Sequence, residues 1–100
     1  MTSLLRRLFG GGPRAEHLTV TVYTRERCCL CHKAIELLED RRKRHGFRIV
    51  AVDIDGDPEL AAKYGEQIPV VAFDGKVRFR MIVNPALLDR LLVAEAAGNR

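Results

Sequence analysis

The chain has 100 residues, 47% of them hydrophobic and 30% charged, with a formal net charge of +4 at pH 7. These values are typical of one small globular domain, and the mild positive charge is compatible with anionic partners without identifying one. No apolar run approaches the ~20 residues of a membrane-spanning helix, so no membrane partner is expected.

The first residues are expected to form an arm before the domain. Arg6 and Arg7 are weakly similar to a twin-arginine export signal, but residues 10–12, all glycine, stand where its apolar segment should be. We therefore predict a flexible arm at residues 1–16 and one domain at residues 17–97.

The first half of that domain has the pattern of a strand, a helix and a second strand. Residues 18–23 alternate Leu or Val with Thr or Tyr, which predicts a strand. Residues 30–44 carry an apolar stripe at helical spacing and end in a basic run before Gly46, a typical helix stop. This basic run lacks interleaved aromatic residues, so no nucleic-acid partner is expected. Residues 47–54 are more continuously apolar, which predicts a buried strand parallel to the first.

The second half has the pattern of a helix, a hairpin and a last helix. Asp57 and Pro58 are a typical N-cap and first residue for a short helix that ends at Gly65. Residues 70–81 predict a hairpin around an Asp-Gly loop. Its second strand alternates apolar residues, expected to point inward, with basic ones, expected to point outward at the sheet edge. Asn84 and Pro85 are a typical N-cap and first residue for a last helix, which is expected to fray after residue 93.

The predicted order is therefore β-α-β-α-β-β-α, an α/β fold. A βαβ unit followed by a hairpin gives one four-stranded mixed sheet with helices on both faces.

Cys28 and Cys31 lie where the first strand meets the first helix. A helix start exposes unpaired backbone N–H groups and the positive end of the peptide dipoles, and this field favours the nucleophilic thiolate. Cys31 follows one helical turn later, close enough to attack a mixed disulfide formed at Cys28. All three cysteines of the chain lie within residues 28–31, which favours a redox or metal role in a reducing compartment over a secreted scaffold.

With these features, the sequence resembles the thioredoxin-fold superfamily, and more closely its glutaredoxin-like members. The resemblance spans about residues 18–93 and rests on the element order and on three motifs: Tyr23-Thr24-Arg25, Cys28-x-x-Cys31 and Ile68-Pro69-Val70. It implies a thioredoxin-like fold and a dithiol–disulfide oxidoreductase that reduces protein or glutathione mixed disulfides. It also implies a cytoplasmic monomer with no bound metal or cofactor, reduced by glutathione or by a reductase.

The resemblance assigns a role to each matching residue. Cys28 is the attacking thiolate and Cys31 the resolving thiol. Pro69 matches a cis-proline beside the cysteines, Ile68 a residue whose backbone pairs with glutathione, and Arg25 a cation that meets a glutathione carboxylate.

Two departures from the family pattern leave the electron donor open. The two glycines and the acidic residue expected after the fourth strand are replaced by residues 81–84, Met-Ile-Val-Asn. Cys29 stands where glutaredoxins often have proline. Either it is a tolerated small residue or it is a third thiol that competes for the disulfide. Because a ring between adjacent cysteines is strained, we expect Cys28 to pair with Cys31.

The sequence leaves three alternatives open, two of which use the same cluster differently. Cys28, Cys31 and His32 fit the Cys-x-x-Cys-His pattern of covalent haem attachment, with Met81 as a second axial ligand. The cysteines and His32 could instead hold zinc or an iron–sulfur cluster. The third alternative is a thioredoxin-fold binding protein with little turnover.

Overall fold

The structure, a computed structural model, describes residues 14–98 of the chain, so most of the predicted arm lies outside the described residues. The elements are β1 (Thr19–Thr24), α2 (Cys29–His45), β2 (Arg48–Asp53), the 3-10 turn η1 (Ile54–Gly56), α3 (Pro58–Tyr64), β3 (Val70–Phe73), β4 (Lys76–Arg80) and α4 (Pro85–Gly98). Apart from the short turn η1, this is the predicted order. No helix in the described part of the chain is long and apolar enough to cross a bilayer.

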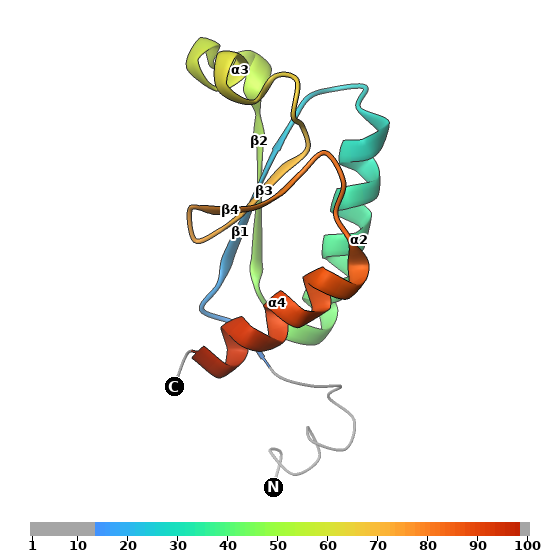
Figure 1. Cartoon of the computed structure of the whole chain (residues 1–100), viewed down its shortest axis with the longest axis vertical. Coiled ribbons are helices and arrows are strands. Elements are labelled where there is room, and N and C mark those ends of the chain that lie inside the picture. The colour runs from blue at the N-terminus through green and yellow to red at the C-terminus, as the bar shows by residue number, and fades with distance from the viewer. Residues whose placement is uncertain (1–13, 99–100) are drawn as a thin grey trace, which may run out of the picture.

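The four strands form one mixed sheet in the order β2-β1-β3-β4 (Figure 1). β1 runs parallel to β2 and antiparallel to β3, and β3 pairs antiparallel with β4. The predicted mixed sheet and the parallel pairing across α2 are confirmed.

The main core lies between the sheet and two helices, α2 and α4. Side chains from one face of the sheet pack there against Leu38 of α2 and against Leu88 and Leu92 of α4, all three with no exposed surface. The sheet side chains in this cluster include Val20, Val22, Val71, Phe73 and Phe79. Ala15 is also part of this core, and its N–H donates to the carbonyl oxygen of His45 at 2.7 Å.

The opposite face of the sheet is covered by α3 at one end. Tyr23 of β1 stacks on Tyr64 of α3 with ring centroids 4.8 Å apart. Tyr23 pairs with Val70 across the β1–β3 ladder, and residues opposite each other share a face. The predicted placement of helices on both faces is therefore confirmed, with α2 and α4 on one side and α3 on the other.

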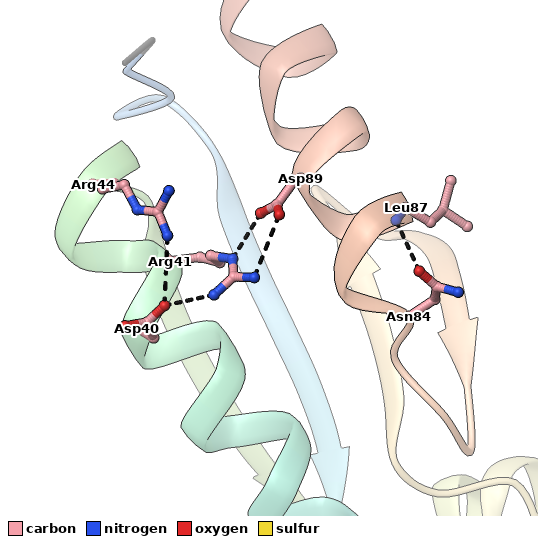
Figure 2. A network of polar contacts seen from close by, with 6 residues as sticks. All are labelled: Asp40, Arg41, Arg44, Asn84, Leu87 and Asp89. Atoms are coloured by element: carbon pink, nitrogen blue, oxygen red, sulfur yellow. Dashed lines mark hydrogen bonds and ion pairs between the residues drawn. The ribbon is translucent and has the colours of Figure 1, made fainter. Parts of the chain in front are cut away.

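Helix ends follow the predicted capping residues. Asp57 accepts hydrogen bonds from the N–H groups of Glu59 and Leu60 at the start of α3, and Asn84 accepts one from Leu87 at the start of α4 (Figure 2). Gly46 ends α2 in the left-handed region at φ 77°, as the sequence predicted.

The hairpin matches its prediction at the turn but not along β4. Asp74 and Gly75 both have positive φ, as an Asp-Gly loop of this kind requires. A register shift opposite Val71 and Ala72 breaks the predicted alternation in β4. Arg78 was expected to point outward, but its Nε is buried without a hydrogen-bond partner in the described part of the chain, and its Nη2 lies 3.8 Å from Glu95.

Two further expectations are wrong. β2 was predicted to be buried, but it is an edge strand, and Val50 at its centre is 39% exposed. Among residues 47–54, only Phe47 and Ile54 are buried, and both lie outside the strand itself. The last helix was expected to fray after residue 93, but α4 continues to Gly98, because Leu91, Leu92 and Ala96 still contact the core.

Candidate functional site

Cys28 and Cys31 form a disulfide at the start of α2, with Cα atoms 5.2 Å apart. Cys28 is the N-cap of the helix, and its Sγ accepts a hydrogen bond from the N–H of Cys31 at 3.2 Å. The first N–H groups of a helix have no partner within the helix. The cysteine sulfur therefore occupies the position where a helix start stabilises negative charge.

The two cysteines differ in exposure. Cys31 is 1% exposed, whereas Cys28 is half-buried and retains access to solvent. Arg27, immediately before Cys28, has a left-handed backbone with φ 61° and turns the chain into the helix. This geometry leaves Cys28 as the accessible member of the pair and places Cys31 behind it.

Cys29 and His32 both point away from the packed core. Cys29 carries a free, exposed thiol, and His32 is exposed one turn along the helix. The disulfide joins Cys28 to Cys31, so the predicted pairing is the one in the structure. Within residues 14–98, no three His, Cys, Asp or Glu residues are grouped so that they could hold a metal ion.

Ile68 and Pro69 precede β3, and the peptide bond between them is cis. Pro69 is fully buried and Ile68 half-buried. Because Tyr23 pairs with Val70 in the antiparallel ladder, Pro69 lies at the level where β1 ends and the chain turns toward Cys28. The carbonyl oxygen of Pro69 accepts a hydrogen bond from Met81 N–H at 2.8 Å, which ties this segment to the end of β4.

Arg25 follows β1 and contacts two other segments. Its Nε donates to Asp55 Oδ1 at 2.8 Å, and its Nη1 donates to the carbonyl oxygen of Gly65 at 3.5 Å. The sequence singled out Arg25 as an anion-binding cation but missed Asp55, which is 30 residues away along the chain. No local pattern indicates that pairing, since Asp53, Asp55 and Asp57 all have the appearance of turn residues.

An apolar groove of about 250 Å³ opens beside the cysteines. It lies between the first turns of α2 and the segment that joins β4 to α4, and its lining residues are Leu30, Lys33, Ala34, Leu37, Met81, Ile82, Val83 and Pro85. Three of these are exposed to an unusual degree for apolar side chains: Leu30 at 41%, Met81 at 48% and Ile82 at 70%. Met81 has φ 68° and leaves the strand, although the alternation of β4 predicted that it points inward.

Comparison with protein families gives one match that covers most of the chain. The family model described as Glutaredoxin-like domain (DUF836) matches residues 19–94. This range begins with β1, ends within α4 and includes both cysteines of the disulfide.

Curated relatives are similar over a shorter stretch. An uncharacterized protein of Mycobacterium tuberculosis is 34% identical over 62 residues, which are 57% of this chain and 64% of that protein. The chain thus spans about 64% of the length of the mycobacterial relatives that it matches. A protein of Methanothermobacter thermautotrophicus described as a probable thioredoxin is 35% identical over 65 residues, 62% of this chain and 76% of that protein.

Solved structures share the arrangement of strands and helices. A Nitrosomonas europaea protein has a TM-score of 0.65 and 26% identity, covering 80% of this chain and 92% of that one. The oxidised thioredoxin of Plasmodium falciparum has a TM-score of 0.58 and 18% identity, covering 94% of this chain and 91% of that one. These likenesses, with the sheet order and helix placement described above, show a thioredoxin-like fold.

Proposed function

Because the chain belongs to the glutaredoxin-like domain family, we propose that it is a dithiol–disulfide oxidoreductase that reduces protein or glutathione mixed disulfides. The observation that supports this most directly is the Cys28–Cys31 pair at the start of α2, with one sulfur accessible and the other buried behind it. A pair of this kind can accept and release two electrons without any other group.

In the first step, the Cys28 thiolate attacks one sulfur of the substrate disulfide. A new S–S bond joins Cys28 to the substrate, and the other substrate sulfur leaves as a thiolate that takes up a proton. The start of α2 favours the attacking thiolate, because the N–H of Cys31 donates to the Cys28 sulfur and the helix dipole is positive there.

In the second step, the Cys31 thiolate attacks the Cys28 sulfur and expels the remaining substrate thiolate. The substrate has gained two electrons and two protons, and the enzyme is left with the Cys28–Cys31 disulfide. A thiol donor, either two glutathione molecules or a dithiol reductase, returns the two electrons.

The apolar groove beside the cysteines supports a protein substrate. Leu30 lines the groove and lies next to Cys31, so a segment that brings its disulfide to Cys28 passes close to this surface. We propose that apolar side chains flanking the substrate cysteine pack there, where burial of exposed Ile82 contributes to binding. The site requires no resident metal or cofactor in this scheme, and we propose that it acts in the reducing cytoplasm as a monomer.

The test is a redox titration of the full chain with reduced and oxidised glutathione, followed by acid trapping and mass spectrometry. We expect a loss of two hydrogens mapped to Cys28 and Cys31, in the wild type and in a Cys29→Ser control. We also expect the wild type to reduce insulin disulfides in the presence of dithiothreitol, and Cys28→Ser to lose this activity. Three thiols that stay free at every ratio, or full activity of Cys28→Ser, would contradict the proposal.

A further inference from the structure

Arg25 is a cation on the segment between β1 and Cys28, and its guanidinium is already paired. Nε donates to Asp55 Oδ1 at 2.8 Å. A guanidinium binds a carboxylate best through two parallel N–H groups along one edge. Because Asp55 takes Nε, an incoming carboxylate must use the remaining Nη protons and lie near a carboxylate of the same charge.

Asp55 is held in position for this pairing by the turns on both sides of it. Its backbone N–H donates to Asp53 Oδ1 at 2.9 Å, which caps η1. Two residues later, Asp57 caps α3 through the N–H of Glu59 at 2.9 Å. The backbone position of Asp55 therefore does not depend on the contact with Arg25, and the carboxylate projects from a fixed turn next to the guanidinium.

The ion pair borders the segments that form the proposed substrate site. The carbonyl oxygen of Gly65 accepts from Arg25 Nη1 at 3.5 Å, and the chain continues from Gly65 through a turn to Ile68 and Pro69. The side chains of Arg25 and Asp55 are 38% and 53% exposed, so both can be reached by a solute. Together they present no net charge at a place where Arg25 alone would attract anions.

We propose that Asp55 is a specificity-determining residue. By pairing with Arg25, it disfavours disulfides that carry carboxylates close to the sulfur, such as those of glutathione, and leaves the site to disulfides within uncharged, apolar protein segments. This inference rests on the proposed function of Cys28 and Cys31 and names the substrate class for it. Asp55 acts through Arg25 and does not itself touch the reacting sulfurs.

The test measures binding without turnover. The probe is S-methylglutathione, which retains both carboxylates of glutathione but has a thioether that cannot exchange, titrated into the oxidised full chain and followed by NMR. In Asp55→Asn and Asp55→Ser we expect the Kd to fall about two- to fivefold, the scale of an exposed ion pair. Glu26→Gln is the matched control. Glu26 is an exposed acid next to Arg25 in the chain, and it makes no ion pair within residues 14–98.

A double-mutant cycle shows whether the effect passes through Arg25. In an Arg25→Gln background, Asp55→Asn should change the Kd by less than the error of the titration. An unchanged Kd in Asp55→Asn, an equal gain in Glu26→Gln, or a gain that persists in the Arg25→Gln background would overturn the inference. Insulin reduction by the same proteins tests the proposed oxidoreductase activity separately. A failure of the Asp55 inference is therefore distinguished from a failure of the proposed function.

Discussion

Arg41 of α2 and Asp89 of α4 join the two helices that cover the core. Arg41 Nε donates to Asp89 Oδ1 at 2.7 Å, and the Arg41 side chain is 15% exposed (Figure 2). Because the hydrogen bond with Asp89 stabilises the charged guanidinium, it raises the pKa of Arg41 above its ordinary value, and the pairing with Asp40 adds to this effect. The contact with Asp89 therefore stabilises the charged form of Arg41.

Removal of the Asp89 charge should weaken the packing of α4 on α2. We expect Asp89→Asn to lower the free energy of unfolding by about 0.5–1 kcal/mol, since Asp89 is itself 44% exposed and solvent screens the pair. Urea denaturation measures the change. Glu36→Gln on the exposed face of α2 is the control, and equal midpoints for the two variants would show that the inter-helix pair contributes nothing.

A side chain at Gly46 should destabilise the end of α2. Gly46 has φ 77°, and a Cβ there would lie 2.5 Å from Arg14 Nη2. We expect Gly46→Ala to cost about 1 kcal/mol or slightly more, because a non-glycine residue in the left-handed region is strained. Gly56→Ala makes the same chemical change where a Cβ would meet nothing within 4 Å. The midpoints of thermal denaturation of the two variants should differ by several degrees. Coinciding curves would show that a side chain at Gly46 is not strained.

Loss of the resolving thiol should trap the reaction at its intermediate. In Cys31→Ser, the mixed disulfide between Cys28 and a glutathionylated or protein substrate has no intramolecular thiol at position 31 to release it. We expect this adduct to accumulate and to be seen as an added mass on the peptide that contains Cys28. Since Cys29 lies next to Cys28, the Cys29→Ser Cys31→Ser double variant tests whether Cys29 can act as a substitute. An adduct found on Cys29 in Cys31→Ser would contradict the proposed order of attack.

A polar residue in the apolar groove should impair reduction of protein substrates more than that of small disulfides. Ile82 is 70% exposed in the groove, so Ile82→Ser removes apolar contact surface with little expected loss of folding stability. We expect the KM for insulin to rise about two- to tenfold while that for hydroxyethyl disulfide stays within about twofold, from the cost of losing part of one buried apolar side chain. Val93→Ser on α4 is the control, because Val93 is 46% exposed and does not line the groove. A similar rise in that control, or no rise in Ile82→Ser, would argue against docking at this surface.

Most of the elements and their ends could be predicted because their causes are local. The alternation of residues 18–23 and the helical stripe of residues 30–44 each report on one face of one element. Asp57 caps a helix whose first N–H groups are two and three residues away, and Asp74 with Gly75 closes a turn within four residues. In each case the interacting groups are neighbours in the chain, so the residue types alone carry the information.

The errors in β2 and β4 have a common physical origin. The run of residues 47–54 is apolar enough for a central strand, but β2 lies at the sheet edge because β3 pairs on the other side of β1. The bulge opposite Val71 turns Arg78 toward the core and ends the alternation before Met81. Burial and side-chain direction in these segments depend on which strands become neighbours. The residue pattern of a single strand carries no information about its neighbours.

By itself, the sequence determined the order of the elements, their caps and the position of the Cys28–Cys31 pair at a helix start, since hydrophobic period and capping act over a few residues. Only the tertiary structure decided that the Arg25 guanidinium meets Asp55, that Arg41 meets Asp89, and that Leu30 and Ile82 line one groove. Those groups are 30, 48 and 52 residues apart in the chain. They meet because the crossover from β1 through α2 to β2 and the return through the hairpin place them side by side, and the packing of the whole core sets that geometry.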